Sequence, residues 1–561
     1  MTATFDVLVI GGGATGAGLL RDLSRRGLHC LLVEKGDLGS GTSGRYHGLL
    51  HSGGRYVAKD PSAARECIAE NRILRRIAPA CIEDTGGWFV ATPHDPDDYV
   101  DGFAAACAAT GVDCEERPAA ELLRREPALH PGIRRAFRVP DATLEPWQLI
   151  EANLADARAH GAEAWPYRRL VGFDRRGDRL LAARIADAQG GEEQVSAACF
   201  VSATGAWAGG VAALAGAEVK MSPGKGTMLV FNERMTDTVV NRCHRPGDGD
   251  IMCPVHTVAI LGTTDILVDD PDHFEITSAE VVELLAEGEK LFPGLSRRRL
   301  LRAYGGVRPL YKPPEPPEPS EAAGSVGAGG AAGAGSGGGD RAISRSHYVI
   351  DHAAADGIAG FVSIVGGKLT TYRLMAEQTA DLVCRKLGLA EASTTAREVL
   401  PDQGDRRHYW LGDRLAEHEA DGGGDADLIC ECEFVTRAGL ERFLDQRWPC
   451  SLDDVRRGTR LGMGPCQGGF CTFRAAGIVA QRLATGRDAA GSGEGGIAAA
   501  ADAATVGFLR ERYKGGRPIA WGRQLQELWM TSGLYWGTLG VAGIPGPSRT
   551  SPDGRGTRAA R

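Results

Sequence analysis

The sequence predicts a mixed α/β protein with a Rossmann-like nucleotide-binding unit at its N-terminus and a small cysteine-containing module near its C-terminus. Three observations support this fold class. The chain opens on an apolar strand pattern that runs into a glycine-rich turn and a helix. Short apolar runs, glycine turns and amphipathic helices then alternate as far as Gly388. Finally, four cysteines form two close pairs beyond residue 425, in a chain of 561 residues that is long enough for several domains.

The first element, FDVLVIGGGATG, is a strand that ends in the pattern G-x-G-x-x-G at Gly11, Gly13 and Gly16. Gly11 permits the tight turn, Gly13 lets the backbone approach a pyrophosphate, and Gly16 permits close packing of the helix on the strand. The next strand, CLLVE, ends at Glu34, which is placed to accept hydrogen bonds from a ribose diol and disfavours a ribose 2′-phosphate. These residues leave NAD and FAD as the candidate cofactors.

The segments that follow favour FAD. Residues 36–56 are rich in glycine and serine, as expected of a loop that crosses close to a long cofactor. Two further glycine-bearing turns, at residues 202–209 and 365–373, each join a strand pattern to a helix pattern. Such turns direct backbone amides at a ligand. The loop also contains side chains that a solvated loop seldom needs, namely Arg45, His47, His51, Arg55 and Tyr56.

Composition divides the chain into parts. Residues 1–388 form the nucleotide-binding and substrate domain, interrupted at about 312–340 by a Pro-rich and then Gly/Ala/Ser-rich insertion that cannot form a packed core. The remaining parts are a linker at 389–425, the cysteine module at 426–483, a loose segment at 484–501, an aromatic-rich helical tail at 502–545 and a disordered end at 546–561. The aromatic tail is expected either to dock a partner or to pack on its own domain.

Charge and hydropathy exclude some functions. A net charge of -8, from 64 basic and 72 acidic residues without long runs of one sign, gives no surface suited to nucleic acid. The N-terminus lacks a secretory signal, so a cytoplasmic protein is expected. Residues 198–217 are apolar but indicate a strand, a turn and a helix, so no transmembrane segment is expected. Most of the 14 cysteines should then be free thiols.

The cysteine module has the spacing C-x-C and then C-x-x-x-x-C, at Cys430, Cys432, Cys466 and Cys471. Core cysteines would not form two tight pairs flanked by glycines, and a disulfide disagrees with a reducing compartment. A four-thiolate zinc site and a [2Fe-2S] cluster both remain open. The cluster is favoured, because structural zinc sites more often use C-x-x-C on both sides.

Taken together, several motifs resemble a known family: GGGATGAG, GTSGRYHGLLHSGGRYV, ARECIAEN, LGTTD, AYGGVRPL and GGKLTTYRLMAE. They resemble the FAD-dependent glycerol-3-phosphate dehydrogenases of the D-amino-acid-oxidase-like flavoprotein fold. The cysteine module, which is similar to bacterioferritin-associated ferredoxin with its [2Fe-2S] cluster, and the tail RYKGGRPIAWG narrow the resemblance to the A subunit of the anaerobic type. The insertion at about 312–340 departs from the family pattern.

The resemblance implies oxidation of sn-glycerol 3-phosphate to dihydroxyacetone phosphate, with hydride passing to flavin N5. It also implies that the cluster passes electrons singly to partner subunits, one of them membrane-associated, and on to menaquinone or another quinone. The protein would then lie at the inner face of the cell membrane through those partners. The expected FAD contacts, besides Gly11, Gly13, Gly16 and Glu34, are Thr42, Ser43, Gly205, Gly366, Gly367, Lys368, Leu369 and Thr370.

The same resemblance assigns the substrate residues. Arg308 and Arg345 match the arginines that hold the phosphate, a task suited to the planar guanidinium fork. Arg55 and Tyr56 match positions near the substrate, and residues 263–265 approach the site. Lys368 would stabilise the reduced flavin. His51 is the predicted general base. The competing interpretations are a structural salt bridge for Arg308, a solvated cap for Lys368 and a cofactor contact or a structural role for His51.

Two other functions remain open from the residues. The same fold could oxidise a 2-hydroxy acid or an amino acid, because carboxylates also bind arginine. Alternatively, the chain could be a non-catalytic electron-transfer protein that relays electrons through flavin and cluster. A flavin that is bleached by glycerol 3-phosphate separates the leading hypothesis from both.

Overall fold

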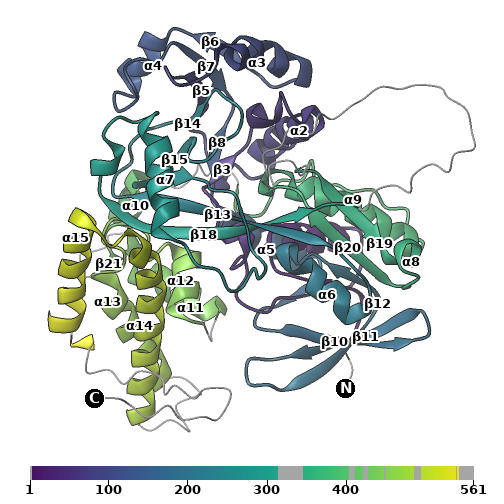
Figure 1. The fold of residues 1–561 in the computed structure, drawn as a ribbon. Coiled ribbons are helices and arrows are strands. Elements are labelled where there is room, and N and C mark those ends of the chain that lie inside the picture. Colours follow the sequence, from purple (N-terminus) through teal and green to yellow (C-terminus); the bar gives the residue numbers. More distant parts are fainter. Residues whose placement is uncertain are drawn as a thin grey trace, which may run out of the picture.

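The computed structural model describes residues 3–313, 345–403, 411–420, 428–447, 450–485, 494–538 and 540–541. From residue 314 onward the expected Gly-rich insertion lies outside the described residues, and so does the expected disordered end at 546–561. Figure 1 shows the described elements as a body built on two sheets, with the C-terminal helices gathered at one side.

The first sheet carries the predicted nucleotide-binding unit. Its strand β1 pairs in parallel with β2 on one side and with β12 on the other. Val7 and Val9 of β1 enter one core, whereas Leu8 and Ile10 enter the core on the opposite face. Burial on both faces explains the continuous apolar run of this strand. The sheet follows the order β10 (Arg169–Arg176), β11 (Arg179–Ala186), β12 (Glu192–Ser202), β1 (Ala3–Ile10), β2 (Cys30–Val33) and β9 (Glu163–Trp165), with β20 (Phe361–Gly366) on β12 and β19 (His347–Asp351) on β20.

Helices cover both faces of this sheet. One face packs against α1 (Ala14–Arg25), α5 (Pro146–Ala159) and α9 (Tyr372–Leu387), whose apolar side chains share the core of Val7 and Val9. The other face packs against α6 (Ala208–Ala215). As predicted for residues 198–217, β12 runs through a turn at Gly205–Trp207 into α6. The sheet with helices on both faces is the predicted Rossmann-like layer.

A second, mostly antiparallel sheet forms the other half of the large domain. Its longest pair joins β13 and β18 over the register from Met221 with Tyr311 to Phe231 with Leu300. Among the described residues its order is β17 (Ile266–Leu267), β13 (Met221–Phe231), β16 (Val258–Gly262), β15 (Ile251–Val255), β14 (Val239–Arg242), β5 (Gly87–Ala91), β7 (Arg135–Val139) and β6 (Glu115–Arg117), with β18 (Leu300–Tyr311) on β13. Figure 1 shows β13 and β18 crossing the middle of the molecule towards β20.

Smaller elements complete this domain. A short sheet consists of β3 (Leu49–Leu50), β8 (Ala142–Leu144) and β4 (Ile82–Glu83). The remaining helices are α2 (Pro61–Ile77), α3 (Asp97–Thr110), α4 (Ala119–Arg125), α7 (Ser278–Glu289) and α8 (His352–Ala355). Asp60 immediately precedes α2, and its side chain accepts a hydrogen bond from the amide of Ala63 and so caps the first turn.

The C-terminal part is mainly helical and has its own apolar core, which includes Leu440, Leu444, Val455, Leu461 and Phe508. Its elements are α10 (Leu411–Ala420), β21 (Leu428–Cys430), β22 (Val435–Thr436), α11 (Arg437–Arg447), α12 (Leu452–Thr459), α13 (Cys471–Thr485), α14 (Glu494–Gly516) and α15 (Gly522–Gly533). The prediction of a loose segment at 484–501 is wrong from residue 494 onward. That stretch is alanine-rich, and the high helix propensity of alanine outweighs its glycines.

Buried ion pairs fasten the cysteine module to the large domain. Arg460, which follows α12, donates from Nη1 to Glu145 and from Nε to Glu433, each over 2.8 Å. The three side chains are at most 7% exposed. A second bridge joins Arg457 of α12 to Asp37 over 2.7 Å. The module is therefore held against the segment that follows β2 and against the start of α5.

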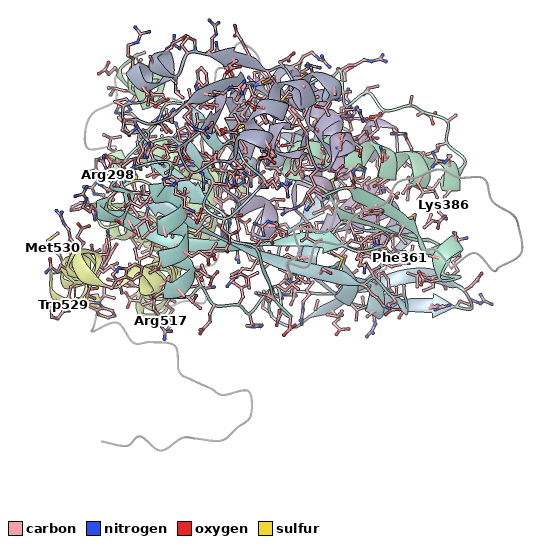
Figure 2. All side chains as sticks on the ribbon, turned by 45° about the horizontal axis from the view of Figure 1, so that its top comes forward. Arg298, Phe361, Lys386, Arg517, Trp529 and Met530 are labelled. Atoms are coloured by element: carbon pink, nitrogen blue, oxygen red, sulfur yellow. The ribbon has the colours of Figure 1, made fainter. Side chains whose placement is uncertain are left out.

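The aromatic tail divides into buried and exposed residues. Tyr535 is 2% exposed and packs beside Leu509, and Trp521 is partly buried against the core of the second sheet. By contrast, Trp529 is 77% and Met530 70% exposed, and Figure 2 shows both projecting from α15 at the edge of the molecule. None of the helices in the described part of the chain has the length and apolar character needed to cross a membrane.

Candidate active site

The glycine turn after β1 has the close contacts that exclude side chains. Gly11 has a φ of +110°, and a Cβ atom at this position would lie 2.7 Å from the carbonyl oxygen of Ala203. A Cβ atom at Gly16 would lie 1.9 Å from the carbonyl oxygen of Gly11. Gly13 immediately precedes α1 and therefore lies at the N-terminal end of that helix. This geometry suits a pyrophosphate held by helix amides.

The acidic residue at the end of β2 is bound to backbone amides. Glu34 accepts hydrogen bonds from the amides of Gly12 over 2.7 Å and Gly36 over 2.9 Å. Burial raises the pKa of its carboxyl group, and these two amides act against that shift. Glu34 therefore braces the glycine turn against the start of the following loop.

That loop carries Thr42 and Ser43 on a short 3-10 helix, Thr42–Gly44. The Ser43 hydroxyl accepts a hydrogen bond from the amide of Ala14 over 3.0 Å, at the first turn of α1. The Thr42 hydroxyl donates to the carbonyl oxygen of Val307 in β18 over 2.6 Å. The predicted FAD residues of the loop are thus tied both to the phosphate-binding helix and to the strand that carries Arg308.

The two other predicted turns adopt backbone conformations that favour glycine. Gly205, Gly366 and Gly367 have φ angles of +58°, +79° and +75°. A Cβ atom at Gly366 would lie 2.4 Å from the carbonyl oxygen of Ser346. After these glycines comes the 3-10 helix Leu369–Thr371, whose Thr370 hydroxyl accepts a hydrogen bond from the amide of His51 over 3.1 Å.

Two histidines and a tyrosine form the centre of the predicted substrate site. The ring of His51 lies 5.9 Å from that of His47 and 5.5 Å from that of Tyr56, between ring centres. Burial lowers the pKa of His47 to about 3 and holds the pKa of His51 well below 6.5. Neighbouring positive charges act in the same direction, so both imidazoles are neutral in the folded protein.

Four cationic side chains surround these rings. Arg55 pairs with Asp250 over 2.9 Å, and Lys368 donates to the carbonyl oxygen of Arg345 over 3.0 Å. The Lys368 ammonium also lies 4.9 Å from the ring centre of Tyr56. After burial and His47, the charges of Arg55, Lys368 and Arg345 also lower the pKa of His51.

Arg308 is held in place by the segment after β16. It donates to Asp265 over 2.8 Å, to the carbonyl oxygen of Thr264 over 2.7 Å and to the hydroxyl of Thr263. Arg345 lies 3.9 Å from the same Asp265 carboxylate. Burial, and then the charge of Arg345, lower the pKa of Arg308 to about 10. Arg308 thus does form a salt bridge, as the competing interpretation proposed. Its partner Asp265 also lies beside a second cation, Arg345.

The structure therefore brings together His51, Arg55, Tyr56, Arg308, Arg345 and Lys368, all of them predicted from sequence. The role of Asp250 was not predicted. It immediately precedes β15, far from Arg55 in the sequence, and no motif marks it. The importance of His47, which lies beside His51, was also missed. Its position among the loop glycines was the available signal.

The four predicted metal cysteines meet in two pairs. Cys430 and Cys471 shift each other's pKa, and so do Cys432 and Cys466. Cys432, and then the backbone of Gly468, Gly469 and Phe470, lower the pKa of the Cys466 thiol to about 6. Among the residues that the structure describes, no group of three or more His, Cys, Asp or Glu side chains is arranged to hold a metal ion.

Comparison with known proteins first identifies the class. Residues 6–373 match the family model described as FAD dependent oxidoreductase, DAO. The fold is similar to that of a glycerol-3-phosphate dehydrogenase from Bacillus halodurans complexed with FAD, at 20% identity, coverage of 95% of each chain and a TM-score of 0.57. It is also similar to glycine oxidase from Geobacillus kaustophilus, at 19% identity, coverage of 72% of this chain and 99% of the other, and a TM-score of 0.53. The chain is thus an FAD-dependent oxidoreductase, and its turns and loop fit that cofactor.

Sequence relatives narrow the class. The A subunit of the anaerobic glycerol-3-phosphate dehydrogenase of Escherichia coli K12 is 39% identical over 557 residues, which cover 96% of this chain and 97% of the relative. The A1 subunit of the Haloferax volcanii enzyme is 40% identical over 565 residues, which cover 95% of this chain and 90% of the relative. The chain belongs to the family formed by the A subunits of anaerobic glycerol-3-phosphate dehydrogenases, and the resemblance found in its motifs is confirmed.

Proposed function

We propose that the chain oxidises sn-glycerol 3-phosphate to dihydroxyacetone phosphate with FAD as the electron acceptor. The observation that carries this proposal is the charge of the site around His51. The site holds four cations and two carboxylates: Arg55 pairs with Asp250, Arg308 and Arg345 lie beside Asp265, and Lys368 donates to a carbonyl oxygen. The surplus of positive charge matches a phosphate dianion better than a single carboxylate. The names of the relatives support the same substrate.

In this proposal the arginines bind the phosphate. Asp265 and Thr263 fix the Arg308 guanidinium before substrate arrives, so little conformational freedom is lost on binding. Arg345, on the other side of the Asp265 carboxylate, supplies the second guanidinium. Planar guanidinium groups form paired, charge-assisted hydrogen bonds with phosphate oxygens.

His51 is proposed to take the alcohol proton. Its imidazole is neutral, which a base requires, but burial, and then the surrounding cations, make it a weak base. A bound phosphate dianion offsets those cations, so substrate binding itself raises the proton affinity of His51. Bound FAD supplies the acceptor for the hydride of the carbinol carbon. Lys368 stabilises negative charge that develops next to it.

The four cysteines are proposed to hold a [2Fe-2S] cluster. Such a cluster takes two ligands on each iron, and the two thiol pairs match this division better than a mononuclear site would. Gly464 supports close approach, because a Cβ atom there would lie 2.4 Å from the Cβ of Cys432. The backbone amides next to Cys466, at Gly468 and Gly469, would be available to cluster sulfur and would tune its potential. The cluster would then accept electrons from the flavin.

Partner subunits are proposed to receive these electrons and deliver them to a quinone at the membrane. The relatives are named as lettered subunits, A and A1, which supports a complex with other subunits. The exposed side of α15, with Trp529 and Met530, is the proposed contact for such a partner, because exposed aromatic and methionine side chains are typical of interfaces. The division into a domain at 1–388, a linker at 389–425, a module at 426–483 and a tail at 502–545 is part of the same proposal.

The substrate assignment is tested with Arg308→Ala and the matched control Arg298→Ala, an exposed arginine just before β18. Loss of charge-assisted hydrogen bonds of about 1.5–3 kcal/mol should reduce kcat/KM for glycerol 3-phosphate by about 10- to 150-fold. FAD content should be unchanged. Arg298→Ala should resemble the wild type. Unchanged kinetics in Arg308→Ala would contradict the assignment.

The cluster is tested by metal analysis of protein purified without oxygen. Wild-type protein should contain iron and acid-labile sulfide in equal amounts near two per chain. Cys432→Ser should lose both, whereas Cys450→Ser, a matched change at a half-buried cysteine of the same module, should keep them. Zinc in place of iron would refute the cluster. The oxidation of glycerol 3-phosphate by FAD would not be affected by that result, because the Arg308 experiment tests it separately.

A further inference from the structure

A cavity with a volume of about 960 Å³ lies between the large domain and the cysteine module. Its walls include the loop residues Gly44 and Arg45, the strand β18 from Arg302 to Gly305, and side chains of α12 and α14. None of the residues assigned to FAD or to glycerol 3-phosphate lines it. The volume is at the upper end of the range for small-molecule sites.

Two arginines of this wall have buried donors without partners. Arg302 of β18 and Arg512 of α14 each have a buried Nε that meets no hydrogen-bond acceptor in the described part of the chain. Arg512 is 8% exposed, and its Nη1 donates to the carbonyl oxygen of Gly462 and to Gln467, each over 2.9 Å. Neither contact supplies a negative charge.

The two arginines also repel each other. Burial lowers the pKa of Arg302 to about 10, and the charge of Arg456 adds to that shift. Burial likewise holds the pKa of Arg512 well below its ordinary value, with the charge of Arg302 as the next cause. Asp453 acts on both arginines and Glu511 acts on Arg302, but Asp453 is already paired with Arg456 and Arg457. The wall therefore holds more positive charge than its own carboxylates offset.

A buried, uncompensated charge is costly unless a partner supplies the opposite charge. Here two guanidinium groups line one cavity, which is the arrangement that phosphate oxygens satisfy through charge-assisted hydrogen bonds. An anion in this cavity would offset both charges at once.

The same cavity has a large apolar wall. Val230, Val255, Val258, Ile260 and Phe274 line it, and Trp147 adds an indole ring. An inorganic anion needs no such surface. Apolar and aromatic walls with a small number of charged groups are typical of sites for organic ligands.

We propose that this cavity binds a phosphate-bearing organic anion of about nucleotide size, with its phosphate on Arg302 and Arg512 and its organic part against the apolar wall. This site is additional to the FAD and substrate sites. It lies between the loop that carries Thr42 and Ser43 and the residues Met463 and Gln467 next to the cysteine pairs. A ligand there would join the two parts of the molecule.

Binding is tested by calorimetry on the full chain saturated with FAD, with adenosine 5′-monophosphate, adenosine and inorganic phosphate as probes. The monophosphate should bind and raise Tm, and both adenosine and inorganic phosphate should bind at least 10-fold more weakly. A tightly held native ligand would mask the probe, so the same preparation is denatured in urea and the released organic phosphates are measured. About one organic phosphate per chain in addition to FAD also supports the site.

The arginines are tested with Arg302→Gln and Arg512→Gln. The matched control is Arg510→Gln, an exposed arginine on the same helix α14 as Arg512. Loss of the charged hydrogen bonds predicts about 10- to 150-fold weaker binding of the monophosphate, or loss of the native ligand, in both variants. The control should match the wild type.

Arg302→Gln also gives a readout that a purely structural arginine would not give. Without ligand it should be at least as stable as the wild type, because an uncompensated buried charge has been removed. With ligand it should be less stable. Four outcomes would overturn the proposal: no probe bound and no ligand released, equal binding of adenosine, equal binding of inorganic phosphate, or unchanged binding by Arg302→Gln.

Discussion

The buried ion pairs of Arg460 predict that Arg460→Gln strongly weakens the contact between the cysteine module and the large domain. The Arg460 guanidinium joins Glu145 of the large domain to Glu433 of the cysteine module over two contacts of 2.8 Å, with side chains 7%, 5% and 0% exposed. Arg460→Gln leaves two buried carboxylates without their cation. Breaking a buried pair in this way costs about 3–5 kcal/mol. The exposed pair of Arg437 with Glu441, both about half exposed, contributes only about 0.3–0.5 kcal/mol.

Hydrogen exchange measured by mass spectrometry on peptides covering α12 reports the opening of this contact, because exchange follows local unfolding. Arg460→Gln should increase the exchange rate there by about 100- to 4,000-fold. Arg437→Gln is the matched control and should change it about 2-fold. Flavin reduction by substrate should persist in both variants. If the two variants exchange equally fast, the buried contact does not fasten the module, and the reasoning is refuted.

Two further predictions concern the large domain. The folded protein keeps His47 neutral, whereas in the unfolded chain the pKa of this histidine is about 6.5. Below that pH the unfolded state binds an extra proton. The free energy of unfolding therefore falls by about 2 kcal/mol between pH 7 and 5. His47→Gln should remove this loss, and His273→Gln, at an exposed histidine, should not; equal pH profiles would contradict the assignment. Gly16→Ala should abolish FAD binding, measured as flavin absorbance per chain, because its Cβ would lie 1.9 Å from the Gly11 oxygen. Gly102→Ala, with open space around its Cβ, should keep FAD, and a flavin-loaded Gly16→Ala would show that the turn tolerates a side chain.

The local elements were the most predictable from sequence. The run from β1 through Gly11 and Gly16 to α1 and Glu34 depends on contacts within one strand-turn-helix-strand unit, so spacing alone indicates it. The helix at 494–501 was missed because a composition rule for loose segments ignored the helix propensity of its alanines.

The partners of the site residues were not predictable in the same way. Arg308 of β18 meets Asp265, which follows β16, because both strands pair with β13. Arg55, on the 3-10 helix Gly54–Tyr56, meets Asp250, which immediately precedes β15. A single sequence records the residues but not these long-range pairings. For the same reason, nothing in the sequence marked Arg302 and Arg512 as members of one cavity wall.

The central claim is that this chain oxidises glycerol 3-phosphate with its own flavin. The most direct test is to purify the FAD-loaded protein without oxygen, record its visible absorbance and add glycerol 3-phosphate. The oxidised flavin bands should disappear in proportion to the added substrate, up to one equivalent, and dihydroxyacetone phosphate should form. Bleaching by a 2-hydroxy acid or an amino acid alone, or no bleaching by any of them, would contradict it.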